Sequence, residues 1–241
     1  MGVSIFSDSA ALNLVDTADG FELPIDSTGL EYLQFHNIKN PARNLATGKP
    51  AAIIVGNMTG NDYSLSLSSR NYYIDTGVLQ TADEYTLFHV MRAPAVSTLE
   101  FAGISNYNDP KDVGMSVMFR PNRMSGISSW ASSGGGNPFV SEASISFTIS
   151  KDYAMALRIE SGSRLNNLTE GTTAKNTPSA GTVINKGTKT FLIGSTQAVL
   201  ANAAAQTHYM SAIFSRRLSD DELQKLYAVA QNYLSTYGIT V

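Results

Sequence analysis

Two stretches of strict alternation between apolar and hydroxyl side chains constrain the fold of this chain more than any other feature. Residues 63–68 read Tyr-Ser-Leu-Ser-Leu-Ser, and residues 145–150 read Ile-Ser-Phe-Thr-Ile-Ser. Successive side chains of a β-strand point to opposite faces of its sheet, so this period of two predicts strands with one buried face and one hydroxyl-covered face. With 28 serines and 20 threonines among 241 residues, hydroxyls supply much of the polar surface of a sequence that is only 15% charged.

Short apolar segments bounded by Gly, Asn, Asp and Pro recur along the whole chain. We expect further strands at residues 31–36, 51–56, 71–75, 85–91, 99–104, 114–120, 153–159, 190–193 and 209–214. Because no helical pattern separates these segments, the sequence predicts an all-β fold, an antiparallel two-sheet β-sandwich. Residues 128–141, which are Gly-rich, and residues 161–189, which are rich in Asn, Thr and Gly, are expected to form loops. Such loops are either mobile surface connections or the frame of a binding edge.

One helix is predicted near the C-terminus. Ser219 followed by Glu222 forms a capping box, and Leu218 and Leu223 occupy the two positions of a hydrophobic staple around it. Apolar residues then recur at helical spacing, so we expect a helix over residues 219–235 that packs one face against the sandwich.

A resemblance to a known family begins in the strand before this helix. Residues 208–227 read His-Tyr-Met-Ser-Ala-Ile-Phe-Ser-Arg-Arg-Leu-Ser-Asp-Asp-Glu-Leu-Gln-Lys-Leu-Tyr. With residues 233–239 they resemble the C-terminal signature of laminin-G-like, concanavalin A-like domains, in which the last long strand leads through an R-x-L-S-x-x-E turn into a short helix. Residues 84–92 resemble the early core strand of that family, and residues 191–195 resemble the strand before its final hairpin.

This resemblance implies a concanavalin A-like jelly roll with sugar, protein or metal ligands along one edge or on the concave face. Because no break in composition marks a boundary, we expect a single domain over residues 26–241, with residues 1–25 as an N-terminal arm or first strand.

Catalytic templates are missing from the sequence. The chain has no cysteine, which removes disulfides, thiolate chemistry and Cys-based zinc sites. It lacks the E-x-D-x-x-E motif by which some jelly rolls cleave glycans, the G-x-S-x-G nucleophile elbow and a correctly spaced P-loop. The histidines His36, His89 and His208 are too far apart for H-E-x-x-H, and we expect them to be structural, with a shared metal site as the alternative. We therefore expect a binding module and not an enzyme, with glycan hydrolase as a lesser alternative.

A carbohydrate site needs an exposed aromatic ring to stack on the apolar face of a sugar, with polar groups beside it. Six residues are candidates for glycan binding: Trp130, Tyr72, Tyr73, Tyr107, Asn106 and Asn108. Trp130 is alternatively a core residue, and the adjacent Tyr72 and Tyr73 should point to opposite faces of a strand. The oxygens of residues 105–112 would also suit calcium, although an ordinary Asn/Asp/Pro turn is the preferred explanation of this segment.

Charge and composition also limit the classes of partner that we expect the chain to bind. The net charge is −3 and the basic residues form no run, which argues against nucleic-acid binding. No apolar stretch approaches membrane-spanning length, so no membrane insertion is expected, and residues 1–8 show no secretory signal pattern. The cysteine-free, Ser/Thr-rich sandwich resembles appendage, decoration or receptor-binding proteins of tailed bacteriophages. That resemblance implies a virion location, binding to a surface polysaccharide or to other virion proteins, and assembly as a homo-oligomer. The alternative is a lectin-like module at the bacterial cell surface or outside the cell.

Overall fold

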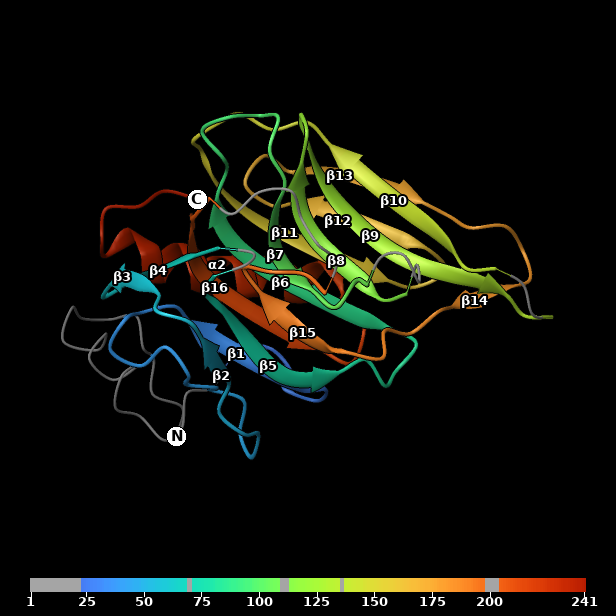
Figure 1. Ribbon diagram of the computed structural model, residues 1–241, viewed down its shortest axis with the longest axis horizontal. Helices are drawn as coiled ribbons and strands as arrows, with labels where there is room; N and C mark the ends of the chain where they lie inside the picture. The colour runs from blue at the N-terminus through green and yellow to red at the C-terminus, as the bar shows by residue number, and fades with distance from the viewer. Residues whose placement is uncertain (1–22, 69–70, 109–112, 135–136, 198–203) are drawn as a thin grey trace.

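Two antiparallel sheets pack face to face in the computed structural model, which describes residues 23–68, 71–108, 113–134, 137–197 and 204–241 (Figure 1). Sheet A has the order β13 (Thr172–Asn176), β12 (Ser163–Asn167), β11 (Asp152–Ile159), β6 (Tyr85–Arg92), β16 (Gln206–Phe214), β4 (Ser64–Leu67) and β3 (Thr59–Asn61), with β1 (Leu30–Phe35) also paired to β16. Sheet B has the order β10 (Phe139–Ile145), β9 (Arg123–Ser132), β8 (Met115–Arg120), β7 (Phe101–Ser105), β15 (Thr190–Ile193), β5 (Tyr73–Leu79) and β2 (Ile53–Val55), with β14 (Thr182–Ile184) paired to β9. The predicted antiparallel sandwich is confirmed.

Strand β6 shows why the centre of sheet A is apolar on both faces. Its first seven residues are all buried, because alternate side chains enter two different cores. Leu87 lies in the core between the two sheets, whereas Phe88 lies in a second core between sheet A and the C-terminal helix α2 (Asp220–Ser235). A strand covered on both faces is continuously apolar and does not alternate.

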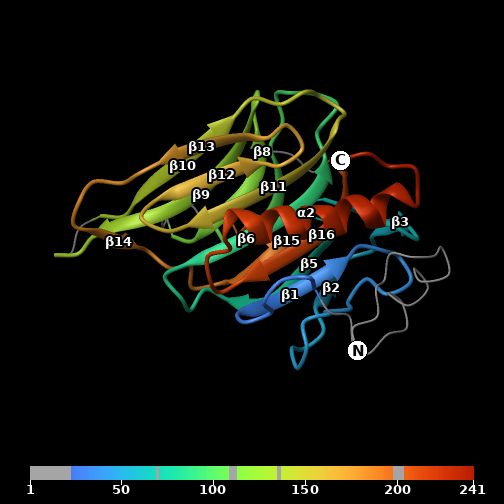
Figure 2. The same cartoon turned by 180° about the vertical axis from the view of Figure 1, so that it is seen from behind.

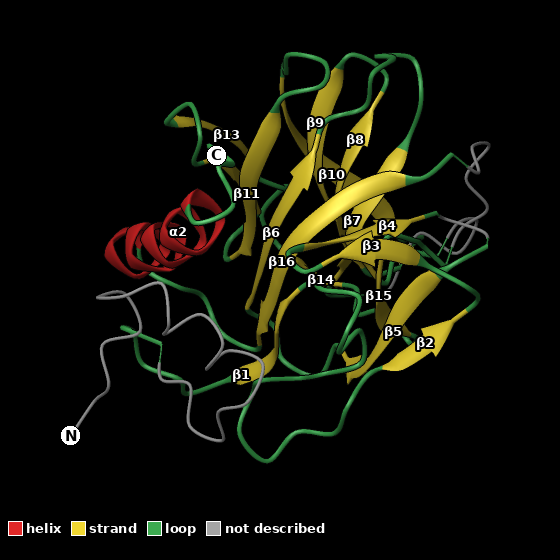
Figure 3. Ribbon diagram, turned by 90° about the vertical axis from the view of Figure 1, so that its left-hand side faces the viewer, coloured by secondary structure: helices red, strands yellow, loops and turns green. Residues whose placement is uncertain are grey.

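Helix α2 runs along the outer face of sheet A, on the side away from sheet B (Figures 2 and 3). The predicted capping box is confirmed: Ser219 Oγ accepts a hydrogen bond from the Glu222 amide at 3.2 Å, and the Ser219 amide donates to Glu222 Oε2 at 2.8 Å. Arg158 of β11 is completely buried beneath the start of the helix, where it donates to the Leu218 carbonyl at 2.9 Å and to the Asp220 carboxylate. With 16 residues, α2 does not cross a bilayer, and no described helix is long and apolar enough to do so.

The prediction that residues 128–141 and 161–189 are loops was wrong in part, because strands occupy portions of both segments. Strand β9 continues to Ser132 and β10 begins at Phe139, while β12, β13 and β14 all lie within the second segment. These strands are held by pairing with other strands: β12 pairs with β11 and β13 with β12 as consecutive hairpins, and β14 pairs with the distant β9. Polar composition therefore does not prevent strand formation there, because the pairing partner and not the local pattern decides it.

The strand predicted at residues 145–150 was also wrong. Strand β10 ends at Ile145, and the chain then turns, with Ser150 at a φ of 60°. The alternation has another cause: the Phe147 ring packs 4.8 Å from the Phe119 ring, while Ile149 is 49% exposed. Of the arm expected at residues 1–25, residues 1–22 lie outside the described part of the chain.

Side chains cover the free edge of β1. Asn44 Oδ1 accepts a hydrogen bond from the Leu33 amide at 3.1 Å, and Asn44 Nδ2 donates to the Glu31 carbonyl at 3.2 Å. The Leu45 amide adds a bond of 2.8 Å to the Leu33 carbonyl. The loop after β1 is thereby fastened along that strand and forms one wall of the cleft described below.

Candidate functional site

Trp130 is a core residue and offers no exposed ring for stacking. Only 5% of its surface is exposed, and it belongs to the core between the sheets. Its indole Nε1 donates to Ser128 Oγ at 2.6 Å, which satisfies the one polar atom of the side chain. The structure thus supports the core interpretation of Trp130 and contradicts the expectation of an exposed stacking platform.

The predicted tyrosines do not gather around one site. Tyr72 and Tyr73 are half-buried at the start of β5, and three strands of sheet B lie between β5 and the β9 strand that carries Trp130. Tyr107 lies after β7, where it packs against Ala102 on the outer face of sheet B. The aromatic candidates are therefore dispersed over the sheet.

Asn106 is a buried structural residue and is not exposed for contact with a glycan. It is completely buried, its Oδ1 accepts a hydrogen bond from the Met115 amide at 2.7 Å, and its Nδ2 donates to Gln80 Oε1 at 3.2 Å. Gln80 Oε1 also accepts from the Gly187 amide at 2.8 Å, so Asn106 and Gln80 join the Met115 and Gly187 amides through three hydrogen bonds. The Asn108 amide donates to the Val113 carbonyl at 3.1 Å.

The calcium expectation finds little support in this segment. Within residues 105–108 and 113–115, Asn106 Oδ1 already accepts a backbone hydrogen bond, and the turn interpretation explains the bridge between Asn108 and Val113. Residues 109–112, which carry the two aspartates of the expected site, lie outside the described residues.

The three histidines meet inside the sandwich. His36 Nε2 and His89 Nδ1 share hydrogen bonds with Ser211 Oγ at 2.7 and 2.8 Å, and His89 Nε2 lies 2.8 Å from His208 Nδ1. Both ring nitrogens of His89 are thus occupied, and among the described residues no group of three or more His, Asp or Glu side chains, this trio included, is placed to hold a metal ion. Burial lowers the pKa of all three imidazoles, that of His208 to about 3, so the trio is neutral and structural.

A cleft of about 260 Å³ opens where the edge strand β1 of sheet A faces β5 of sheet B; we call it the edge cleft. Its lining comprises Glu31, Asn44, Lys49, Pro50, Thr76, Gly77, Val78, Leu79 and Thr81. Pockets for drug-sized ligands span roughly 300–1,000 Å³. The edge cleft therefore suits a smaller ligand, about one sugar residue in size.

An ion pair forms the polar wall of the edge cleft. Glu31 Oε2 accepts a hydrogen bond from Lys49 Nζ at 2.5 Å, and Glu31 Oε1 accepts from Ser215 Oγ at 2.8 Å. The Lys49 side chain remains 38% exposed, so its ammonium can still reach a ligand. Although burial opposes ionisation, the hydrogen bonds from Lys49 and Ser215 lower the pKa of Glu31. The carboxylate is therefore charged at neutral pH.

A local bend in β5 forms the opposite wall. Asp75 Oδ1 accepts a hydrogen bond from the Gly77 amide at 3.0 Å, and Gly77 has a φ of 71°, a conformation that favours glycine. Thr76 Oγ1 donates to the Phe191 carbonyl at 2.8 Å and holds the bend against β15. Beyond it Leu79 is 50% exposed, which gives the cleft an apolar surface opposite its ion pair.

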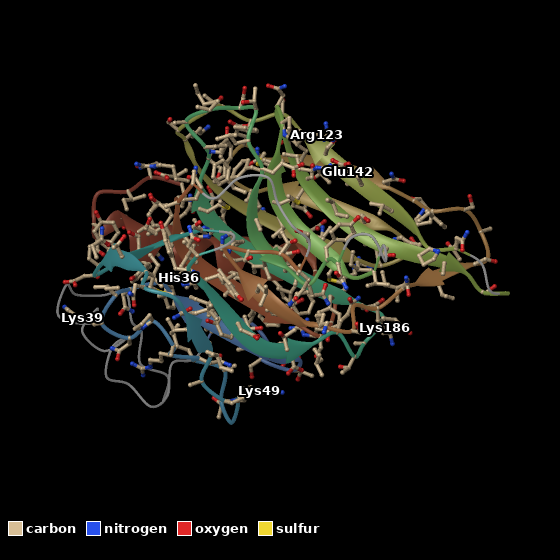
Figure 4. All side chains as sticks on the ribbon, in the orientation of Figure 1. His36, Lys39, Lys49, Arg123, Glu142 and Lys186 are labelled. Atoms are coloured by element: carbon tan, nitrogen blue, oxygen red, sulfur yellow. The ribbon has the colours of Figure 1, made fainter. Side chains whose placement is uncertain are left out.

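A second group of charged side chains lies on the outer face of sheet B, and its members form hydrogen bonds with one another. Glu142 accepts hydrogen bonds from Arg123 at 2.7 Å, from Arg120 at 3.1 Å and from Ser125 at 2.6 Å, and Arg120 also binds Glu100 at 3.1 Å. Figure 4 shows Arg123 and Glu142 together at one end of the sandwich, well away from Lys49. Burial would raise the pKa of Glu142, but its hydrogen bonds and the two arginines hold it below the ordinary value. This network clamps β8, β9 and β10 together.

No family model matches the chain, and no curated protein matches it in sequence. Solved structures do match. The binding domain of botulinum neurotoxin DC in complex with SialylT has a TM-score of 0.63 at 14% identity over 85% of this chain and 52% of that one. The receptor-binding domain of botulinum neurotoxin D has a TM-score of 0.61 at 13% identity over 84% and 53% of the two chains.

The sandwich is similar to the receptor-binding domains of botulinum neurotoxins. A type C structure, whose title describes cell entry through interaction with two ganglioside molecules, matches with a TM-score of 0.61 at 12% identity over 84% of this chain and 51% of that one. The chain spans about half the length of these structures. At such identities the likeness establishes the fold, and the ligand has to be argued from the residues.

The edge cleft was not predicted from the sequence. Glu31 and Lys49 are separated by a loop, and Leu79 comes from the other sheet, so no spacing motif connects the three. The only local signal was the Asp75–Gly77 segment, which interrupts an apolar strand with turn-forming residues.

Proposed function

We propose that this chain is a non-catalytic carbohydrate-binding module and that its edge cleft accepts one sugar residue. One observation carries the proposal: a cleft of sugar-residue size that sets the Glu31–Lys49 ion pair opposite the exposed Leu79 side chain. A sugar ring presents hydroxyls at its rim and C–H groups on its faces, and the two walls of the cleft complement these two surfaces. The similar sandwiches whose titles name SialylT and gangliosides support the same ligand class.

The charges of the cleft favour binding over hydrolysis. Enzymatic cleavage of a glycosidic bond ordinarily uses two carboxyl groups, one of them protonated as the general acid. Among the described residues, Glu31 is the only carboxylic residue that lines the edge cleft, and its lowered pKa leaves it without a proton to donate at neutral pH. We therefore expect no new reducing ends when the protein is incubated with bacterial polysaccharides.

A glycan array with matched variants tests the proposal. Lys49→Gln removes the exposed ammonium of the cleft, and Lys175→Gln removes an exposed ammonium on the edge strand β13 as a control. We expect Lys49→Gln to weaken glycan retention about tenfold, equivalent to losing one charged hydrogen bond, and Lys175→Gln to leave it unchanged. Equal retention by the two variants, or no retained glycan with the unaltered protein, would refute the role of the edge cleft.

We further propose that the glycan belongs to a host surface and that the chain acts on a virion of a tailed bacteriophage as a homo-oligomeric appendage. The support is compositional: a cysteine-free sandwich rich in serine and threonine. Genes for tail or capsid proteins beside its own gene would favour this location, whereas a secreted-protein operon would favour the bacterial surface module. Light scattering at high concentration tests assembly, and a strict monomer would contradict it.

A further inference from the structure

A row of polar and aromatic side chains crosses four neighbouring strands on the α2 side of sheet A; we call it the Arg92 row. Asp152 begins β11, Arg92 ends β6, Tyr209 lies in β16, and Tyr63 directly precedes β4. These strands are adjacent in the order β11, β6, β16, β4, and Asp152 is the register partner of Arg92. The edge cleft is formed by other strands, so the row is a separate feature.

Arg92 is held rigidly by one edge of its guanidinium group. Nε donates to Asp152 Oδ1 at 2.9 Å and Nη2 donates to Asp152 Oδ2 at 2.8 Å. Tyr209 donates its hydroxyl to the same Oδ1 at 2.9 Å, which fixes the carboxylate in turn. Among the described residues, Nη1 of Arg92 has no hydrogen-bond partner, so the other edge of the guanidinium keeps its donors available.

Exposure differs sharply between the two ends of this ion pair. The Arg92 side chain is 47% exposed, whereas the Asp152 side chain is 10% exposed. The net charge of the ion pair is zero, but the part of the pair that is exposed to solvent is mainly the positive Arg92 side chain. The hydrogen bond with Asp152 raises the pKa of Arg92, burial opposes this rise, and Tyr209 and Tyr63 add to it. The guanidinium is therefore always charged, and Tyr63 lies within its electrostatic reach.

Two stacked tyrosines lie at the β4 end of the Arg92 row, and Tyr63 is the one within electrostatic reach of Arg92. The ring centroids of Tyr63 and Tyr237 are 4.6 Å apart with an interplanar angle of 32°, and Tyr237 contacts Tyr233 at 5.5 Å. Tyr233 is buried at the C-terminal end of α2, while Tyr63 and Tyr237 are half-buried and so reach the surface. The aromatic surface is thus preorganised and keeps part of its area in contact with solvent.

We infer that the Arg92 row is a binding site for a carboxylate-bearing sugar residue. The free edge of a guanidinium presents two parallel N–H donors whose spacing matches a carboxylate, and Arg makes such paired contacts better than Lys. The adjacent tyrosine rings supply an apolar surface for the C–H face of the same sugar. Because the pairing with Asp152 fixes the guanidinium before the ligand arrives, little side-chain entropy is lost on binding.

NMR titration of the full chain with two small probes tests the inference. The probes are methyl glucuronide, which carries the carboxylate, and methyl glucoside, which has a hydroxymethyl group in its place. We expect the glucuronide to bind about tenfold tighter, with the largest shifts at the amides around Arg92, Tyr63 and Tyr237. Arg92→Gln paired with Asp152→Asn removes both charges together, so that no charge is left unpaired, and should abolish this preference. Lys175→Gln is the charge control.

Three outcomes would overturn the inference. They are equal affinity for the two probes, a preference that survives in the Arg92→Gln/Asp152→Asn variant, and loss of the preference in Lys49→Gln alone, which would place the carboxylate in the edge cleft. Tyr63→Leu gives an independent check that leaves the ion pair intact: it should weaken both probes by a similar factor. Because the array result depends on Lys49 and the glucuronide preference on Arg92, either proposal can fail without the other.

Discussion

His89 Nε2 and His208 Nδ1 lie 2.8 Å apart inside the sandwich, so one of these nitrogens carries a hydrogen and donates a hydrogen bond, and the other accepts it. With His36, they form a trio that stays neutral because burial lowers each pKa below its ordinary value near 6.5. The unfolded chain binds protons at these positions in mild acid, and the folded chain does not.

Unfolding free energy should therefore be at its full value above about pH 6.5 and fall as the pH drops below it. Each proton bound only by the unfolded chain contributes a slope of about 1.4 kcal/mol per pH unit, so three histidines approach about 4 kcal/mol per unit near pH 5. Urea denaturation between pH 7 and 5 measures this slope. His208→Gln should reduce it by about one third, and a flat profile would contradict the neutral trio.

Gly103→Ala should destabilise the fold by about 1–3 kcal/mol through overpacking. A Cβ atom at Gly103 would lie 2.7 Å from His89 Cδ2 and 3.0 Å from the Val117 carbonyl oxygen. Gly134→Ala is the matched control, since its Cβ would meet only Ser132 Oγ at 4.0 Å. Thermal denaturation of the two variants gives the comparison, and equal melting temperatures would show that β7 shifts to make room.

Trp130→Ala should lower stability by about 3–5 kcal/mol, as for other buried tryptophans. Glycan binding per folded molecule should not change, because the ring faces the core and not the solvent. Trp130→Phe keeps most of the ring but loses the hydrogen bond to Ser128, and should cost less. Loss of glycan retention by a folded Trp130→Phe protein would restore the original stacking hypothesis.

Ser219→Ala should destabilise the protein by about 1 kcal/mol, because the amide of Glu222 loses its capping acceptor. Ser235→Ala, at the other end of α2, removes a hydroxyl that donates to the Asn232 carbonyl within the same helix, and serves as the control. Guanidinium denaturation followed by circular dichroism compares the two. If both variants unfold at the same midpoint, the capping box contributes nothing measurable.

The elements that were predicted correctly carry their signal locally. The capping box of α2 lies within four consecutive residues, and the apolar runs of β6, β11 and β16 reflect strands covered on both faces. Strands β12 to β14 escaped prediction because their short sequences carry few large apolar residues, and pairing with β11, β12 and β9, respectively, defines them as strands.

The candidate sites depend on contacts between residues that are far apart in the sequence. Lys49 reaches Glu31 through a loop fastened by Asn44, and Tyr63 comes near Arg92 only because β4 and β6 flank the same strand. Trp130 was a candidate because it is an aromatic residue beside a Gly-rich segment, yet its burial depends on the opposing sheet. Residue type alone does not show which face of a strand is covered.

The side-chain amide of Asn44 along β1 has a consequence for how other molecules can approach. An unpaired strand edge invites β-augmentation, in which a foreign strand extends the sheet through main-chain hydrogen bonds of little sequence selectivity. Here the Leu33 amide and the Glu31 carbonyl, which an incoming strand would need, are already engaged within the chain. The chain must therefore recognise partners at this edge through side-chain contacts, which favours selective binding over unselective self-association.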